Sequence, residues 1–246
     1  MLAHLSSSLN LTRMMRLLSS AHPIALRNSN AKRWNEEKIN LMNPYIVDTK
    51  YCTNELIKLI FEEETTYNSI CTKRNEMLAK TGFYYEEFIS KEYHEDFNDF
   101  QVMHDFHKMA EAQKQANELQ IEINKIGISI EIKEYSLCAL CGALLQIAKQ
   151  GISIVHKELN ICPNGRNIKT ETLKNIIWQG RNQSLHFEEG KYNIHVTKCF
   201  ANLKNDFGDY YLLDVDYPKN LARHIVKLLE WNTYSKYEAD MILLLG

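Results

Sequence analysis

The sequence predicts an all-α protein: a helical bundle with additional helices before it. Three observations favour this fold class. Nine Gly and four Pro in 246 residues are too few for the dense turns of an all-β chain. Apolar residues recur at helical spacing in several long blocks, with short turn-forming stretches between them. A hydrophobic content of 45% with 24% charged residues is ordinary for a globular protein, which argues against wholesale disorder.

Charge is unevenly distributed along the chain. The formal net charge of −2 gives no overall basic balance that would indicate nucleic-acid binding. Between 149 and 186, however, six basic side chains outnumber two acidic ones. Local positive potential of this kind steers a polyanion even when the total charge is slightly negative. The longest apolar run, 137–148, is too short to span a bilayer, so no membrane partner is expected.

Residues 1–41 are predicted to form a basic, poorly ordered leader. Residues 1–33 contain five Lys or Arg side chains and no acidic side chain. This composition is typical of a mitochondrial transit peptide. A flexible basic extension and translated sequence upstream of the natural start are the competing interpretations. We expect the folded part to begin at Met42 and the protein to be cytoplasmic, with mitochondrial import as the lesser alternative.

Residues 42–94 are predicted to form an N-terminal helical segment. Asn54 is a suitable N-cap for a helix whose apolar side chains begin at Leu56. Gly82 is expected to interrupt the helical pattern. A long acidic segment with spaced aromatic residues then runs from Phe83 towards Leu119.

Residues 95–246 are predicted to form the main helical bundle. Isoleucines alternate from Ile121 to Ile132, which is typical of a strand, but Gly127 breaks the alternation. We therefore expect a turn between two long helices here, with a short strand as the alternative. From about 130 to 159 the apolar residues form a broad stripe that indicates a buried helix.

Three further helices are expected in the C-terminal part of the chain. Thr170 is a plausible cap for a helix that continues past Gly180 to His186. A second helix is expected over 196–203, and a third over 221–231. No repeat period and no glycine-rich phosphate loop is present in the sequence.

The six cysteines give no sign of a disulfide framework or a metal centre. Their spacing is irregular, and no secretory signal is evident. Cys138 and Cys141 form a C-x-x-C pair, but they lie within an apolar helical run and lack a second ligand pair for zinc. We expect small core residues in a reducing compartment, and no metal or cofactor.

One group of side chains in the sequence could carry out a reaction: Arg181, Asn182 and His186. Asn182 and His186 are four residues apart and lie on one face of a helix. Arg181 and His186 are five apart, roughly 140° around the helix axis, a separation that a long Arg side chain can span. A guanidinium clamps a phosphate, and an imidazole transfers protons near neutral pH. Phosphodiester cleavage needs both groups, and it needs no metal.

These residues resemble the signature of the HEPN superfamily, in which an Arg, commonly followed by Asn, precedes a His by a few residues. The resemblance covers roughly 95–235. It implies an all-α bundle that forms a homodimer, with Arg181 and His186 near the seam. It further implies a metal-independent endoribonuclease that leaves a 2′,3′-cyclic phosphate and a 5′-hydroxyl. Such proteins act as toxins or antiviral-defence effectors, so an antitoxin or other regulatory protein is an implied partner beside the RNA substrate.

Two other interpretations of the same residues stay open. His186 can be a structural histidine that bonds within the bundle. The chain can also be a non-catalytic HEPN-like module that binds a partner protein or nucleotide through Arg181 and His186. Histidines at 104 and 107 beside an acidic residue form a weaker candidate metal face. Acidic residues after Phe200 miss the spacing of a calcium loop and indicate a polar loop.

Overall fold

The computed structural model describes residues 43–89, 99–214 and 216–246. The predicted leader and the predicted boundary between residues 94 and 95 lie outside the described residues. Six α-helices account for most of the described chain, which confirms the all-α fold class.

Residues Thr49–Leu245 form one compact unit, to which the following description applies. Residues 43–48 and Gly246 are grouped separately.

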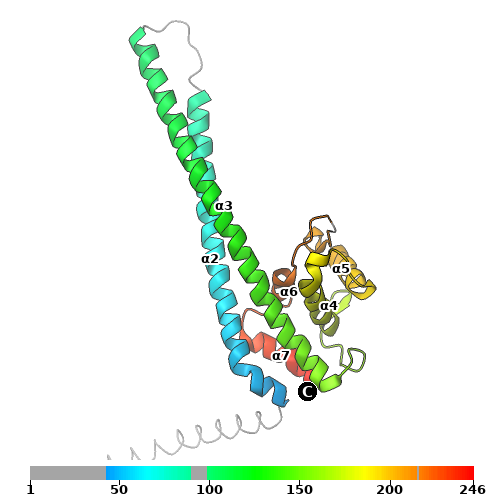
Figure 1. Ribbon diagram of the computed structural model, residues 1–246. Coiled ribbons are helices and arrows are strands. Elements are labelled where there is room, and N and C mark those ends of the chain that lie inside the picture. The colour runs from blue at the N-terminus through cyan, green and yellow to red at the C-terminus, as the bar shows by residue number, and fades with distance from the viewer. Residues whose placement is uncertain (1–42, 90–98, 215) are drawn as a thin grey trace, which may run out of the picture. The chain divides into compact units, whose positions relative to one another are not determined.

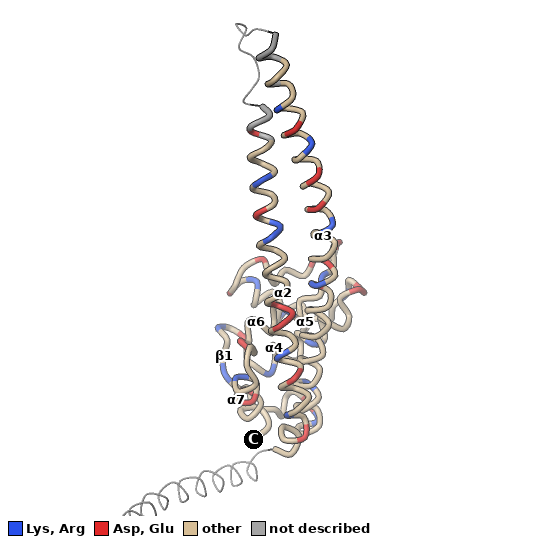
Figure 2. Tube along the Cα trace, turned by 90° about the vertical axis from the view of Figure 1, so that its left-hand side faces the viewer, with Lys and Arg blue, Asp and Glu red and all other residues tan. Residues whose placement is uncertain are grey.

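Two long helices form an extended arm (Figure 1). Helix α2 spans Pro44–Ile89 and helix α3 spans Asp99–His156. They run side by side in opposite directions, and Lys133 of α3 forms an ion pair with Glu63 of α2. Buried apolar side chains such as Met77 of α2 and Ile123 of α3 lie between them. Figure 2 shows that charged residues are scattered along both helices of the arm.

The predicted helix start at Asn54 and the predicted interruptions at Gly82 and Gly127 were wrong. Asn54 and Gly82 lie inside α2, and Gly127 lies inside α3. The alternating isoleucines belong to two helical stripes rather than to a strand: Ile123 is buried, whereas Ile121 and Ile128 are more than half exposed. One stripe faces the neighbouring helix and the other faces outward. An alternating pattern was therefore produced by two faces of one helix.

A short hairpin and four helices follow α3. Strands β1 (Asn167–Ile168) and β2 (Glu171–Thr172) pair antiparallel and lead into helix α4, Leu173–His186. The remaining elements are η1 (Phe187–Glu189), α5 (Ile194–Phe207), η2 (Asp209–Tyr211), α6 (Ala222–Leu228) and α7 (Tyr234–Leu245).

The predicted C-terminal helices are confirmed with shifted ends. The first begins after Thr172, because Thr170 lies in the hairpin turn and donates its backbone N–H to the Asp206 carboxylate at 3.0 Å. The helices expected over 196–203 and 221–231 correspond to α5 and α6. Helix α7 was not predicted.

The core is built on the C-terminal half of α3. Helices α4, α6 and α7 all pack against it. Leu137, Leu144 and Ile152 of α3 are fully buried, as are Ile176 of α4 and Ile225 of α6. By length and composition, Phe106–His156 is also long and apolar enough to cross a membrane, although the predicted run of 137–148 is not. A core helix that three other helices cover passes the same test of length and composition, so the test alone does not identify a membrane span.

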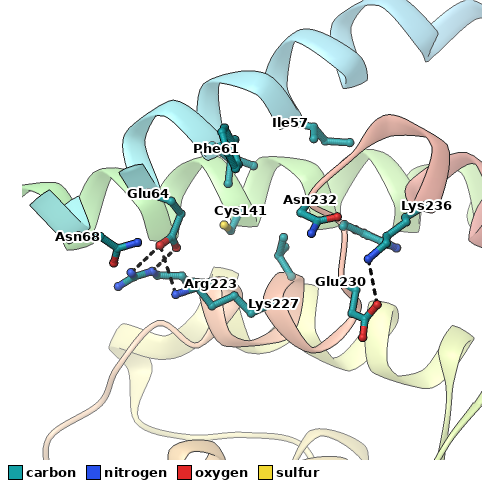
Figure 3. A pocket seen from close by; sticks show the side chains of 13 residues that line it. Ile57, Phe61, Glu64, Asn68, Cys141, Arg223, Lys227, Glu230, Asn232 and Lys236 are labelled. Atoms are coloured by element: carbon teal, nitrogen blue, oxygen red, sulfur yellow. Dashed lines mark hydrogen bonds and ion pairs between the residues drawn. The ribbon is translucent and has the colours of Figure 1, made fainter. Parts of the chain in front are cut away.

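A buried guanidinium joins α6 to both long helices (Figure 3). Arg223 is 6% exposed and donates to both carboxylate oxygens of Glu64 on α2, at 2.6 and 2.9 Å. Its third nitrogen donates to Glu134 of α3, and its guanidinium lies 4.0 Å from the centre of the Tyr67 ring. Burial alone would raise the pKa of Glu64, but the bonds to Arg223 and Lys227 outweigh it and lower that pKa. The three helices thus share one neutralised charge cluster.

Replacing Arg223 should reveal the energetic weight of this cluster. In Arg223→Met, the Glu64 and Glu134 carboxylates lose their buried counter-charge, so the free energy of unfolding should fall by about 3–5 kcal/mol. Lys227→Met is the matched control, because Lys227 pairs with the same Glu64 at 3.2 Å but is 55% exposed. That variant should lose less than about 1 kcal/mol. Urea denaturation measures both, and equal losses would contradict the central role of Arg223.

The unbroken path of α3 predicts the effect of a second substitution. A Cβ at Gly127 would meet no atom within 4 Å. Gly127→Ala should therefore stabilise the protein by about 0.5–1 kcal/mol, because alanine loses less backbone entropy in a helix. Denaturant titration tests this. A loss of stability would indicate that the backbone turns here instead of continuing as a helix.

Candidate functional site

Helix α4 holds the predicted motif against α3 and α6. Its apolar residues Leu173, Ile176 and Ile177 are fully buried, which fixes the rotation of the helix about its axis. Close approach to α6 depends on Gly180, where a Cβ would lie 3.0 Å from Cγ2 of Ile225. The motif therefore sits on a helix whose position is tightly determined.

Arg181 is anchored to the long helix α3. Its Nε donates to the side-chain oxygen of Gln146, and its Nη1 lies 3.4 Å from Oδ1 of Asn182. Lys149 of α3 is close by, with its ammonium 4.4 Å from the centre of the Trp178 ring. Burial, with a contribution from the Arg181 charge, lowers the pKa of Lys149. Two cationic side chains thus adjoin each other where α3 meets α4.

His186 lies at the C-terminal end of α4, with its side chain 48% exposed. Its Nδ1 is 2.6 Å from a carboxylate oxygen of Glu189 in η1. This contact fixes one ring nitrogen and leaves Nε2 as the nitrogen that can exchange a proton with a bound molecule. A carboxylate-held imidazole is a recurrent arrangement for general acid–base chemistry.

The structure brings the three predicted residues together only in part. Arg181 and Asn182 contact each other directly. Asn182 and His186 are one helical turn apart on the same face of α4, as the spacing predicts. Arg181 and His186 are bonded to different partners, one on α3 and the other in η1. Within one chain the guanidinium and the imidazole are therefore held separately.

Sequence reasoning missed a row of polar side chains along α4. Asn182 donates to Gln179 at 3.5 Å, Gln179 donates to Asn175 at 3.2 Å, and Asn175 donates to Glu171 at 2.6 Å. Each amide thus accepts from one neighbour and donates to the next. Positions 175, 179, 182 and 186 share one face of the helix, and this spacing was the available signal. The row connects the motif to a carboxylate at the other end of α4.

That carboxylate, Glu171, lines a small polar pocket beside α5. It is 7% exposed and also accepts a bond from Asn202 of α5 at 2.8 Å. The pocket has a volume of about 330 Å³, and His195 and Lys198 also line it. Cys199 is buried in its wall, and burial raises the pKa of the Cys199 thiol, which keeps that thiol protonated. The pocket's carboxylate is thus held by the side-chain amides of Asn175 and Asn202.

Gln183, inside the predicted motif, has a structural role. Its side chain is fully buried. Its amide nitrogen donates to the backbone carbonyl of Lys219 at 2.7 Å, and its oxygen accepts from the backbone N–H of Leu221 at 2.9 Å. This side chain ties the end of α4 to the segment that leads into α6.

A larger cavity of about 530 Å³ lies between α2, α6 and the start of α7 (Figure 3). Ile57, Phe61 and Trp231 give it apolar walls, and Lys227 and Lys236 reach its rim. Both lysines are already paired, with Glu64 and Glu230 respectively. The two lysines at the rim of this cavity therefore already have ion-pair partners within the chain.

The other sequence candidates do not form a site. The side chains of Cys138 and Cys141 are buried in α3, and burial raises their pKa values to about 11 and about 12. His104 and His107 line a shallow polar pocket on the arm. Among the residues that the structure describes, no group of three His, Cys, Asp or Glu side chains is placed to hold a metal ion.

The close contact at Gly180 predicts that the packing of α4 against α6 is sensitive to added side-chain volume. Gly180→Ala should destabilise the protein by about 1–3 kcal/mol, because the new Cβ crowds Ile225. Gly142→Ala is the matched control, since its Cβ would lie 3.6 Å from Oγ of Ser184, an ordinary contact. It should leave stability equal or higher. Thermal unfolding of both variants tests this, and an unaffected Gly180→Ala would show that α4 and α6 separate easily.

Comparison with known proteins identifies no relative of this chain. No family model, no curated protein and no solved structure matches it. The function of the α4 surface therefore has to be argued from its chemistry.

Proposed function

We propose that the chain is a metal-independent endoribonuclease of the HEPN type, a toxin or antiviral-defence effector that acts through the C-terminal half of α4. The observation that carries the proposal is the pair formed by His186 and Glu189. An exposed imidazole with Nδ1 held by a carboxylate is equipped to move a proton through Nε2. The positive charges of Arg181, on the preceding turn of α4, and of Lys149, on α3, would attract the phosphate.

In the proposed reaction, Nε2 of His186 accepts the proton of the ribose 2′-hydroxyl. The 2′-oxygen then attacks the adjacent phosphorus, and the bond from phosphorus to the 5′-oxygen breaks. The products carry a 2′,3′-cyclic phosphate and a 5′-hydroxyl once the leaving oxygen gains a proton. Glu189 stabilises the imidazolium that forms in the first step.

Arg181 and Lys149 are proposed to bind the phosphate. Arg181 presents a planar fork that suits two phosphate oxygens, and its anchoring by Gln146 limits the conformational entropy lost on binding. Asn182 contacts the same guanidinium and is proposed to orient it. Lys149 is proposed as the second cation, since its ammonium lies 4.4 Å from the centre of the Trp178 ring on α4.

A second copy is part of the proposal. In-line cleavage needs proton transfer on both sides of phosphorus, and one chain offers one motif imidazole. Two α4 helices meeting across a two-fold axis would bring the Arg181 of one copy towards the His186 of the other. Such pairing would bring together two groups that bond to different partners within a single chain. An antitoxin or another regulatory protein would act by covering the same surface.

The proposal predicts a specific pattern of RNA cleavage. Purified protein should cleave single-stranded RNA in excess chelator, and a 2′-O-methyl substrate should resist because its nucleophile is blocked. His186→Ala should lose about 10²–10⁴-fold in rate, since a positioned acid–base group is removed. Arg181→Lys should also fail because it lacks the planar fork. Asn182→Ala should retain partial activity. Analysis of the 3′ ends identifies the cyclic phosphate.

His107→Ala is the control for these variants, because His107 is an exposed histidine on the arm. It should cleave at the unaltered rate. Chelator-sensitive cleavage, 3′-hydroxyl products or full activity in His186→Ala would reject the proposal. A chain that shows no cleavage and no toxicity on expression would instead favour the non-catalytic binding module, in which Arg181 and His186 contact a partner.

A further inference from the structure

The polar pocket between the start of α4 and α5 has a carboxylate in its inner wall. Glu171 immediately precedes Thr172, the N-cap of α4, and is 7% exposed. One of its oxygens accepts from the side-chain amide of Asn175 at 2.6 Å, and the other accepts from that of Asn202 at 2.8 Å. These two bonds, one from α4 and one from α5, hold the carboxylate in place.

This carboxylate can accept further hydrogen bonds from a bound molecule. Each oxygen of an ionised carboxylate has two lone pairs. Asn175 and Asn202 supply one bond to each oxygen of Glu171, so a molecule with two adjacent donors can bond both oxygens at once. Because a buried carboxylate has lost most of its water, such a donor pair gains more here than on an exposed carboxylate.

The rim of the same pocket can bind an anion. His195, Lys198 and Asn202 line the pocket, and their spacing of three and four residues places them on one face of α5. The first two of these side chains belong to exposed residues. An ammonium and an imidazole both donate hydrogen bonds to phosphate oxygens. The pocket thus combines a buried pair of acceptors with an exposed edge that suits a phosphate.

Among the four RNA bases, guanine matches this combination. Its Watson–Crick edge presents two adjacent donors, the ring N1–H and the exocyclic amino group. Adenine and cytosine present one amino group beside an acceptor nitrogen, and uracil presents one N–H between two acceptor oxygens. Only guanine can therefore donate to both oxygens of Glu171. The pocket volume of about 330 Å³ is at the small end of the range for ligand sites, which suits a single base.

We propose that this pocket binds one guanosine of the RNA substrate, with the base edge on Glu171 and a phosphate at Lys198 and His195. That the guanosine belongs to RNA rests on the proposed function. Helix α4 is 14 residues long, about 20 Å, and the pocket and His186 are at its opposite ends. The guanosine is therefore bound several nucleotides from the cleaved bond, and the pocket leaves the C-terminal half of α4 to the second copy.

Oligonucleotides that cannot be cleaved test the base preference independently of catalysis. Fluorescence anisotropy with the full chain compares short 2′-O-methyl oligouridines that carry a single guanosine, inosine or adenosine. The guanosine oligonucleotide should bind about 5–150-fold more tightly than the adenosine one, the range for a bidentate contact to a base. Inosine lacks the amino group and should lie between them. Equal binding of all three would overturn the inference but not the proposed cleavage, which requires no particular base.

Three substitutions assign the preference to the pocket. Glu171→Gln should abolish it, because the side chain keeps its volume but offers one acceptor oxygen. Glu158→Gln, at an exposed glutamate in the loop after α3, is the matched control and should retain it. Lys198→Gln should weaken all three oligonucleotides equally and reduce the salt dependence, because it removes a phosphate contact. A guanosine preference that survives Glu171→Gln would overturn the inference.

Guanosine 5′-monophosphate, used as a competitor, distinguishes RNA from a free nucleotide. The oligonucleotide should bind more tightly, because its further phosphates reach Arg181 and Lys149. Equal affinity of the mononucleotide would overturn the assignment to RNA. Cleavage assays on unmodified RNA separate this inference from the proposed function. A chain that prefers guanosine but does not cleave would contradict the ribonuclease proposal alone and would support the guanosine pocket.

Discussion

The buried guanidinium of Arg223 is the interaction on which the assembly of this chain depends. It brings α6 into contact with α2 and α3 at once, because its three nitrogens reach carboxylates on both long helices. Burying a guanidinium costs desolvation free energy, and the two carboxylates offset that cost. Without it the two carboxylates would repel each other beside the core. Helix α6 in turn supplies Ile225, against which α4 rests at Gly180.

The long helix α3 serves two different parts of the molecule. Its C-terminal half is the shared floor for α4, α6 and α7. Its N-terminal half belongs to the arm, where one face contacts α2 and the outer face mixes exposed isoleucines with polar side chains such as Lys114 and Asn117. Further along the helix the same outer face anchors Arg181 through Gln146.

Sequence reasoning was most successful where a single periodicity was present. The helix through Arg181 and His186 was predicted because Leu173, Ile176 and Ile177 recur at helical spacing on one side. It failed in α3, because isoleucines on two opposite faces imitate the alternation of a strand around Gly127. It also could not foresee the partners of the motif. Gln146 is 35 residues from Arg181, and no local pattern connects them.

The order of the core elements along the chain has a consequence for biosynthesis. Helix α3 ends at His156, whereas the helices that cover it are encoded in the ninety residues that follow. At about 5–20 residues per second, the apolar floor formed by Leu137, Leu144 and Ile152 waits for several seconds or longer before α7 is translated. During that interval the face of α3 that α4, α6 and α7 later cover is open on the ribosome. The nascent chain is thus most vulnerable to aggregation while its longest helix is complete and its C-terminal third is still missing.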